Sequence, residues 1–248
     1  MIHTLTAPVQ WQRVDLLSDL HLGPDTPGTL ARLERHLAET PAQAVLLLGD
    51  IFEVWVGDDA RHEPFEAGVV RLLREASQRL ELFFMHGNRD FLVGPELLRD
   101  AGMTALPDPT VLDAFGQRWL LVHGDAQCLA DAAYQAFRRQ VRSAEWQAQV
   151  LAQPLTARQA LGRQMREGSR TAQAAQLMST DLDADACRAL LNDVGATTMI
   201  HGHTHRPAEH DLGNGLKRIV LSDWDLDATP PRGDVIRMSA AGLQRLSL

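Results

Sequence analysis

The chain has 248 residues, of which 45% are hydrophobic and 23% are charged, and its net charge is −8. This length and composition are ordinary for a globular protein that folds as one large α/β domain, and they argue against a disordered chain. The negative charge argues against a protein that tracks nucleic acid, because binding to a phosphate backbone rewards basic surfaces.

The first ninety residues alternate between apolar runs and segments with helical spacing. We expect strands over 14–19, 44–50 and 82–88, and helices over 29–39 and 69–80. This alternation predicts a largely parallel sheet with right-handed crossovers. The polar residues that end the strands then meet at one edge, where open α/β sheets place their sites.

Strand-like runs follow one another without intervening helices in most of the second half. Residues 111–115 and 118–124 predict a hairpin around Gly116, and further strands are expected over 197–205 and 216–224. These runs indicate a second, mixed sheet packed on the first. The predicted fold class is therefore α/β (α+β), with two sheets and flanking helices.

Residues 129–191 are rich in Ala, Gln and Arg and contain no strand-like run. Apolar residues at three- and four-residue steps predict amphipathic helices, which Pro154 and Gly168 separate. We interpret the segment as a helical cap inserted into a single domain that spans 1–248. Its apolar stripe consists of Tyr134, Phe137, Val141, Trp146, Val150 and Leu151.

The cap segment is also basic, whereas the rest of the chain is acidic. Residues 130–176 hold seven arginines against Asp131, Glu145 and Glu167. This excess indicates either a face for an anionic ligand or membrane, or simply a solvated helix surface. The arginines are Arg138, Arg139, Arg142, Arg158, Arg163, Arg166 and Arg170.

The cysteines, the first ten residues and the length of the apolar runs indicate in which cellular compartment the protein works. Cys128 and Cys187 occur without a CxxC spacing, so neither a disulfide framework nor a zinc knuckle is predicted. Residues 1–10 lack the features of a signal peptide, and no segment approaches the roughly 20 apolar residues of a membrane span. We expect a cytoplasmic protein whose contact with a membrane is peripheral.

Polar residues with metal-ligand chemistry stand where the strand-like runs stop. Carboxylate, amide and imidazole groups without thiolates suit divalent ions such as Mn²⁺. Two such ions about 3.5–4 Å apart form the usual device for in-line displacement at phosphorus. The pattern therefore predicts a phosphoester or pyrophosphate hydrolase. The candidate ligands are Asp19 and His21 in SDLHLG, Asp50 in LLLGD, Asn88 in HGNRD, His123 in LVHGD, and His203 and His205 in HGHTH.

Taken one at a time, these residues have ordinary explanations as turn formers, helix N-caps or hydrogen-bonded core groups. The complete ordered set is much harder to explain in that way. Asp19 and His21 are two residues apart, so on a regular strand they would point to the same side and serve one ion. We expect His86 to orient its loop and His201 to lie outside the ligand set. The histidines expected at the surface are His3, His36, His62 and His210.

The order of these blocks resembles the calcineurin-like metallophosphoesterases, which carry D-x-H, G-D, G-N-H-D/E, H and G-H-x-H. Arg89 departs from that pattern, because most of the superfamily has histidine there. Longer stretches at 52–59, 86–94, 123–138 and 201–210 are similar to the UDP-2,3-diacylglucosamine diphosphatases of the lipid A pathway. The resemblance runs from about residue 14 to residue 224, and it implies a two-sheet sandwich flanked by helices.

The resemblance also implies how two divalent ions, expected to be Mn²⁺, are held. One ion would be bound by Asp19, His21, Asp50 and His205. Asp50 would bridge to the second ion, with Asn88, His123 and His203 as the other ligands. A water between the ions would lose its proton near neutral pH and become the nucleophile. The catalytic residues would be Asp50, Asn88, Arg89 and His203.

Arg89 limits the kinds of phosphate ester that the site is expected to cleave. Arginine does not release its proton at usable pH, but it holds a phosphate with two hydrogen bonds. The leaving group should therefore need no general acid. A phosphate monoester meets this condition, because its second pKa is about 6 and it leaves as a stable anion. This favours cleavage of a P–O–P link over cleavage of an alkyl phosphate ester.

The resemblance extends to substrate contacts. Asn88, Arg89 and His203 would touch the diphosphate, and three residues of the cap would lie near the sugar and acyl portion: Asp131, Tyr134 and Ser169. The ordinary alternatives are that Asp131 caps the helix beginning at Ala132 and that Ser169 caps a helix after Gly168. Gln173 and Gln176 stand where the best-known relatives have Asn and Lys, and we assign them no role.

The reaction implied is hydrolysis of UDP-2,3-diacylglucosamine to UMP and 2,3-diacylglucosamine 1-phosphate (lipid X), with water attacking the phosphorus attached to uridine. The cap's apolar stripe would line a groove for acyl chains or, alternatively, form part of the hydrophobic core. Its arginines would give weak peripheral contact with the inner membrane, and no obligate protein partner is expected. The alternatives are a metallophosphoesterase for a soluble nucleotide or phosphomonoester, and a catalytically silent scaffold.

Overall fold

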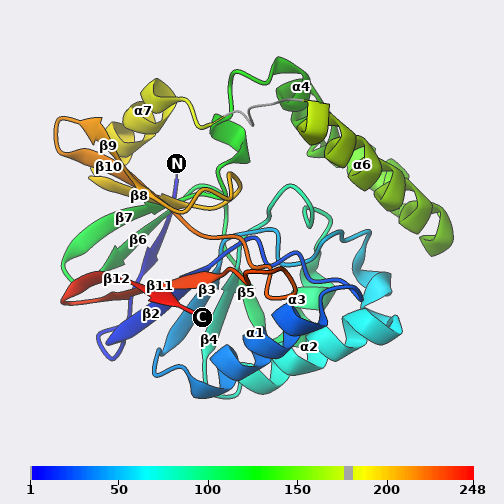
Figure 1. Cartoon of the computed structure of the whole chain (residues 1–248), viewed down its shortest axis with the longest axis horizontal. Helices are drawn as coiled ribbons and strands as arrows, with labels where there is room; N and C mark the ends of the chain where they lie inside the picture. The colour runs from blue at the N-terminus through cyan, green and yellow to red at the C-terminus, as the bar shows by residue number, and fades with distance from the viewer. Residues whose placement is uncertain (1, 176–180) are drawn as a thin grey trace.

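The computed structural model describes residues 2–175 and 181–248, except for the side chains of 169–175. Two six-stranded sheets face each other, and helices cover both outer faces (Figure 1). The apolar layer between the sheets is contributed by both of them, with Leu16, Leu46 and Phe83 on one side and Leu121 and Ile200 on the other. The predicted two-sheet sandwich is therefore confirmed.

The first sheet is built on four parallel strands, as the alternation in the first ninety residues predicts. Two antiparallel strands from the C-terminal residues extend it, and sequence analysis did not assign these. Its order is β12 (Gly242–Ser247), β11 (Asp234–Ser239), β2 (Arg13–Leu17), β3 (Ala44–Leu47), β4 (Glu81–Phe84) and β5 (Met103–Ala105).

The second sheet is mixed, as predicted. The hairpin of β6 and β7 is antiparallel, whereas β7, β8 and β10 run parallel to one another. Its order is β1 (His3–Thr6), β6 (Thr110–Ala114), β7 (Gln117–Leu121), β8 (Thr198–His201), β10 (Leu216–Val220) and β9 (Glu209–Gly213).

Three helices cover the outer face of the first sheet: α1 (Pro27–Glu39), α2 (Pro64–Ala76) and α3 (Pro95–Ala101). Each begins with a proline, whose fixed φ suits the first helical turn and whose missing N–H is not needed there. This explains why α1 and α2 begin before the predicted positions 29 and 69. Two short 3₁₀ segments, Asp58–His62 and Asp125–Gln127, lie in loops.

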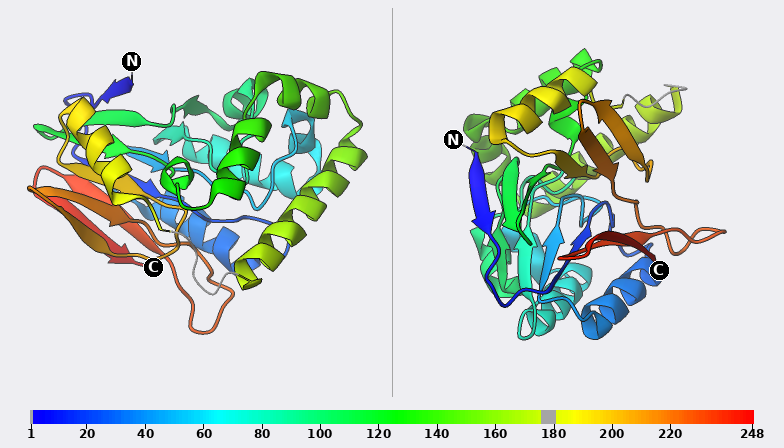
Figure 2. Two further views of the ribbon diagram at one scale, coloured as in Figure 1. Left: turned by 90° about the horizontal axis from the view of Figure 1, so that it is seen from above. Right: turned by 90° about the vertical axis from the view of Figure 1, so that its left-hand side faces the viewer.

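The cap consists of α4 (Ala132–Val141), α5 (Ala144–Leu151) and α6 (Leu155–Ala175). These helices lie beyond one end of the sandwich, as the views from above and from the side show (Figure 2). Helix α7 (Ala184–Val194) falls partly inside the segment predicted as cap, but it packs on the outer face of the second sheet. No helix among the described residues is long and apolar enough to cross a membrane.

A buried ion network ties α1 to the first sheet. Arg237 of β11 donates to both carboxylate oxygens of Asp15 (2.7 and 2.8 Å), and Thr40 also donates to Asp15 (2.5 Å). Nε2 of His36 lies 3.1 Å from Asp15. The prediction that His36 is at the surface was wrong, because α1 turns it inward and only 8% of it is exposed. Burial raises the pKa of Asp15, but Arg237, His36 and Thr40 outweigh it and lower that pKa to about 2.

This network predicts a specific loss of stability in acid. Because the folded pKa of Asp15 is depressed, its contribution is present above about pH 4 and is lost as the pH falls through 2, and it amounts to about 2 kcal/mol. Asp15→Asn should lower the free energy of unfolding at pH 7 by about 2–4 kcal/mol, since it leaves Arg237 without its charge partner. Urea unfolding between pH 2 and 7 tests this. An unchanged acid dependence in the variant would show that Asp15 is not the titrating group.

Candidate active site

The candidate ligands lie in loops at the carboxyl ends of parallel strands. Asp19 follows β2, Asp50 follows β3 and Asn88 follows β4, while His123 follows β7 and both His203 and His205 follow β8. Each strand ends earlier than predicted, so every candidate ligand stands outside regular β structure. Because the two sheets face each other, these loops meet at one end of the sandwich, on the side of the cap (Figure 1).

The backbone at these residues adopts an uncommon conformation. Seven non-glycine residues in the described chain have positive φ, and five of them are candidate ligands: Asp19, His21, Asp50, His203 and His205. Such conformations are costly outside glycine and persist only where the surroundings enforce them, which is typical of functional sites. The argument that Asp19 and His21 share one side of a strand was therefore wrong, since a turn brings them together.

One set of candidate ligands consists of Asp19, His21 and His205. Nε2 of His205 lies 3.2 Å from Nε2 of His21 and 3.2 Å from Oδ1 of Asp19. The ligand atoms of the three residues all lie within 4.8 Å of one another. This spacing suits a single ion, and the imidazole and carboxylate donors suit a divalent metal.

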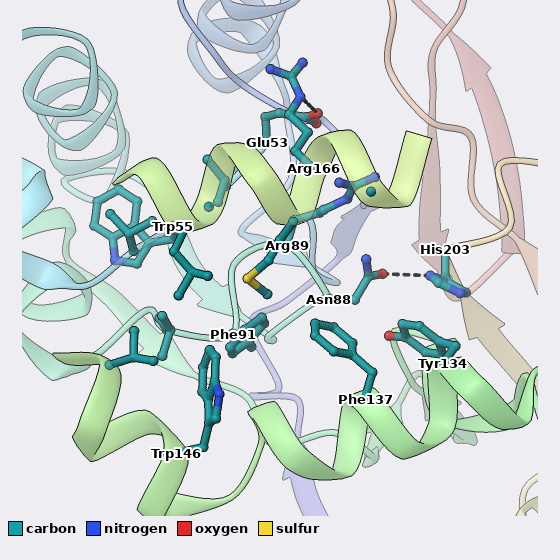
Figure 3. A pocket seen from close by; sticks show the side chains of 18 of the residues that line it. Glu53, Trp55, Asn88, Arg89, Phe91, Tyr134, Phe137, Trp146, Arg166 and His203 are labelled. Carbon is teal, nitrogen blue, oxygen red and sulfur yellow. Dashed lines mark hydrogen bonds and ion pairs between the residues drawn. The ribbon is translucent and has the colours of Figure 1, made fainter. Parts of the chain in front are cut away.

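A second set lies beside it. The ligand atoms of Asp19, Asp50 and His123 also fall within 4.8 Å of one another. Oδ1 of Asn88 lies 3.0 Å from Nε2 of His123 and 2.8 Å from Nδ1 of His203 (Figure 3). The structure thus brings all seven candidate ligands into one region. Asp19 is common to both sets, and the bridging role expected for Asp50 stays a prediction.

Hydrogen bonds orient these side chains. Nδ1 of His123 donates to the backbone oxygen of Leu48 (2.9 Å), which leaves its Nε2 facing Asn88. The backbone N–H of His203 donates to Asp19 (2.9 Å), and that of Arg89 donates to Asp50 (2.7 Å). A buried carboxylate needs such partners, and these partners also set its direction.

Two glycines allow the loops to approach the carboxylates this closely. A Cβ atom added at Gly87 would lie 2.1 Å from Oδ1 of Asp50. One added at Gly202 would lie 2.2 Å from Oδ2 of Asp19. Neither distance is compatible with a side chain, so the glycines of HGNRD and HGHTH are required by packing against the ligands.

Burial and mutual charge dominate the electrostatics of the site. Burial raises the pKa of Asp50 to about 6, although His123 and His21 oppose the shift. Burial also raises the pKa of Asp19, but the charges of His205, His123 and His21 outweigh it and hold that pKa well below its usual value. In His123 burial lowers the pKa, yet Asp50 and other carboxylates raise it to about 9. The positive charge that His123 gains in this way offsets the buried carboxylates, and bound cations would fill the same role. Burial lowers the pKa of His203 to about 4, so His203 does not share in this balance.

The two remaining histidines of the motifs act as predicted. Nε2 of His86 lies 2.7 Å from the backbone oxygen of Val93, so His86 holds the loop after β4. His201 is fully buried, 2.8 Å from the oxygen of Gly202 and 3.1 Å from Arg218. Burial lowers the pKa of His201 to about 3, so it stays neutral outside both ligand sets.

A cavity of about 450 Å³ separates the cap from the body next to the ligands. Its wall is largely apolar and includes Phe91, Trp146 and Val150. At the other end stand Asn88, Arg89 and His203 (Figure 3). The arrangement joins a polar, metal-binding end to a long apolar chamber, and it suits a ligand that carries both an anionic and an apolar part.

Comparison with known proteins identifies the family. The description Calcineurin-like phosphoesterase applies to the family model that matches residues 12–207. The chain belongs to the calcineurin-like phosphoesterase family. It is therefore a metal-dependent hydrolase.

Close relatives of this phosphoesterase are named UDP-2,3-diacylglucosamine hydrolase. The protein of Bordetella pertussis is 43% identical in an alignment of 242 residues that covers 94% of each chain. That of Xanthomonas axonopodis pv. citri is 44% identical over 248 residues, covering 94% of this chain and 98% of the relative. That of Ralstonia nicotianae is 42% identical over 238 residues, covering 91% and 88%. Within its family, the chain belongs to the group of these hydrolases.

The cap residues predicted to touch the substrate divide into three cases. Asp131 lines the cavity, and its carboxylate also accepts from the backbone N–H of Tyr134 (2.9 Å), so the N-cap explanation holds for it. Tyr134 lines the cavity, and its ring lies 6.0 Å from the ring of His203. The side chains of Ser169 and Gln173, and all of Gln176, lie outside the described residues.

Three carboxylates that were not among the predicted site residues organise the phosphoesterase site. Asp125 of HGD is fully buried and accepts from Tyr134 (2.8 Å) and Arg138 (2.8 Å) of α4. Asp90 of GNRD accepts from the backbone of Ile51 and Gly87 and joins two ligand loops. Glu53 lies beside His21. Asp125 and Asp90 stand inside the motifs HGD and GNRD. An acidic residue next to a candidate ligand was therefore the signal by which the sequence could have revealed them.

Four of the six cap arginines whose side chains the structure describes fasten the cap to the body, which neither sequence interpretation anticipated. Arg138 pairs with Asp125, and Arg142 donates to the backbone oxygen of Gly87 (2.7 Å). In α6, Arg158 is buried and pairs with Asp59, and Arg166 pairs with Glu53. These four arginines bind carboxylates or a backbone oxygen of the body, whereas Arg139 and Arg163 are exposed.

Removal of Asp50 should weaken metal binding while the fold persists. Asp50→Ala deletes a buried carboxylate that is 2% exposed and lies within 4.8 Å of the ligand atoms of Asp19 and His123. After reconstitution with a divalent metal, we expect the variant to hold less metal per chain than the wild type, and turnover to fall by roughly 10³-fold or more. Elemental analysis and circular dichroism test this, with exposed Asp211→Ala as the control. Fewer than one metal ion per wild-type chain after reconstitution would instead support the silent scaffold.

Proposed function

We propose that this phosphoesterase hydrolyses the diphosphate of UDP-2,3-diacylglucosamine to UMP and 2,3-diacylglucosamine 1-phosphate. The observation that carries the proposal is the apolar cavity that ends at Arg89 and the ligand sets. Relatives that match nearly the whole chain have the corresponding name, which supports the same substrate. A soluble nucleotide would leave most of this cavity wall without a partner.

Two metal ions, proposed here as Mn²⁺, would supply a hydroxide nucleophile and offset negative charge on the phosphates. Asp19, His21, Asp50, Asn88, His123, His203 and His205 would hold them. The oxygen of water would bond to the phosphorus attached to uridine, and the bond from that phosphorus to the bridging oxygen would break. The bridging oxygen would leave with the sugar phosphate, and UMP would carry the new oxygen.

Arg89 would hold the diphosphate rather than protonate the leaving group, because a guanidinium keeps its proton at usable pH. Its backbone N–H donates to Asp50, so the residue that grips the phosphate is tied directly to a ligand. Asn88 and His203 stand beside it at the cavity end and would complete the contact. The departing phosphate monoester needs no acid, because it is already a stable anion.

The cap would hold the sugar and the acyl chains. Asp131 and Tyr134 line the cavity near His203, and with Ser169 they are our proposed contacts for the glucosamine portion. The apolar wall would enclose parts of the acyl chains. Burial contributes about 0.8 kcal/mol per CH₂, so enclosing even a few methylenes is worth several kcal/mol. We propose that the cap and the sandwich act as one domain.

We also propose weak, peripheral attachment to the cytoplasmic face of the inner membrane, where such a lipid would be met. Five large apolar side chains of the described residues are notably exposed: Val9, Val54, Leu129, Phe137 and Leu151. Leu129, Phe137 and Leu151 lie on or next to the cap helices, and Val54 lines the cavity beneath them. Exposed Arg139 and Arg163 would add attraction to anionic head groups.

A substrate comparison tests the proposal. With Mn²⁺ present, we expect UDP-2,3-diacylglucosamine to be hydrolysed with a kcat/KM at least about 10³-fold above that of p-nitrophenyl phosphate or a cyclic nucleotide, because only the lipid fills the cavity. Product analysis in ¹⁸O-labelled water should place the label in UMP. Faster turnover of the soluble esters would support the alternative of a soluble nucleotide or phosphomonoester substrate.

Arg89 variants test its proposed contact. Arg89→Ala should lower kcat/KM for the lipid by about 10²–10³-fold, since a charged group that stabilises the reacting phosphate is lost. Arg89→Lys should recover part of this, because lysine keeps the charge but not the two-pronged geometry. Steady-state kinetics measure both, and the pH profile should not acquire a new acid limb in either variant. Unchanged kinetics in Arg89→Ala would refute the contact.

A further inference from the structure

We propose that Glu53 is a positioning residue that orients His21 in the metal site and connects that site to cap helix α6 through Arg166. The inference deepens the proposed function, because it rests on the metal site that function requires. It does not depend on which phosphate ester is the substrate. Glu53 follows the Asp50 block and lies in the loop after β3, and its side chain meets that of Arg166 beside α6 (Figure 3).

The orientation of His21 is the first step. Its Nε2 atom faces the first ligand set, 3.2 Å from Nε2 of His205 and 4.0 Å from Oδ1 of Asp19. Its Nδ1 atom, on the other side of the ring, lies 3.1 Å from Oε2 of Glu53. A neutral imidazole carries one N–H, so an ion held at Nε2 requires the proton at Nδ1. The Glu53 carboxylate lies at ion-pair distance from Nδ1, where it can accept a hydrogen bond from this N–H. Such partners fix the tautomer and ring orientation of metal-bound histidines.

The second oxygen of Glu53 leads to the cap. Oε1 of Glu53 pairs with Nε of Arg166 on α6 (Figure 3). Arg166 also lies 3.6 Å from Oδ2 of Asp25, which is more exposed than Glu53. The side chain of Glu53 is only 13% exposed, so both of its contacts are shielded from water. One carboxylate therefore touches a candidate ligand with one oxygen and the cap with the other.

The other described ion pairs of α6 show what the Glu53 contact adds. Arg158, near the start of the helix, pairs with Asp59 and is 4% exposed. Arg166 lies eight residues further on, about 12 Å along the helix axis. The ion pair between Arg158 and Asp59 fixes the N-terminal part of α6. The ion pair between Arg166 and Glu53 fixes the part next to Met165, which lines the cavity. An ion that locks His21 would thus steady Glu53 and, through Arg166, the cavity wall.

The experiment separates the two contacts without any substrate. Variants Glu53→Gln, Glu53→Ala and Arg166→Gln are compared with the wild type, and Arg163→Gln is the matched control on the exposed side of the same helix. Calorimetric titration of the metal-free proteins measures Mn²⁺ affinity. Amide hydrogen exchange of residues 159–168, with and without Mn²⁺, measures the order of α6.

We expect Glu53→Gln to weaken one Mn²⁺ site by about 10-fold and Glu53→Ala by up to about 100-fold, as is typical when the partner of a metal-bound histidine is lost. Arg166→Gln should leave Mn²⁺ affinity nearly unchanged but abolish the protection that Mn²⁺ confers on residues 159–168. Arg163→Gln should match the wild type in both measurements. Because Glu53→Gln preserves the shape of the side chain, it carries the comparison if Glu53→Ala does not fold.

Two results would overturn the inference. Wild-type Mn²⁺ affinity in both Glu53 variants would refute the orienting role. Equal protection of α6 by Mn²⁺ in the wild type and in Arg166→Gln would refute the connection to the cap. Failure to hydrolyse the lipid would count against the proposed function only, since none of these measurements uses a substrate.

Discussion

The burial of Asp19 and Asp50 next to each other is the constraint on which the rest of the site depends. Both side chains are almost wholly removed from water, and each has an oxygen within 4.8 Å of a ligand atom of the other. Two buried anions at this separation repel each other and lose their hydration, so they persist only where cationic or hydrogen-bonding partners surround them. The imidazoles and the backbone N–H groups of Arg89 and His203 meet that need, and a pair of divalent ions would meet it more fully. Gly87 and Gly202 leave the room for these loops to approach the carboxylates.

The sandwich explains how so many groups reach one place. Parallel strands end at the same edge of a sheet, and the two facing sheets bring two such edges together. The ligand loops then leave the strands through left-handed turns, which direct the side chains inward. The cap adds the apolar chamber. Its arginines form ion pairs with carboxylates of the body, such as Asp125 and Glu53. These ion pairs hold the cap, and with it the chamber, beside the ligands.

Much of this could be predicted from the sequence, and the failures have physical causes. Local patterns of residue type and spacing predicted the strand–helix alternation, the mixed second sheet and all seven candidate ligands. The observed fold agrees with the predicted one. Strand ends were placed too late, because apolar residues such as Leu48 continue past the end of the strand, which for β3 is Leu47. His36 was misplaced because its burial depends on Asp15 and Arg237, which lies two hundred residues away. The uses of Arg158 and Arg166 were not foreseen, since their partners are distant carboxylates.

Side-chain types and short spacings along the chain were enough to establish the chemistry: which donors are available, that arginine replaces histidine in GNRD, and that a helical segment interrupts the strands. None of these conclusions needs knowledge of the fold. The packing of the sheets and helices was needed to show that Asp19 belongs to both ligand sets, that α7 covers the second sheet, and that Glu53 stands between His21 and α6. Such relations join residues far apart in the chain, and they are set by how the sheets and helices pack rather than by any local preference.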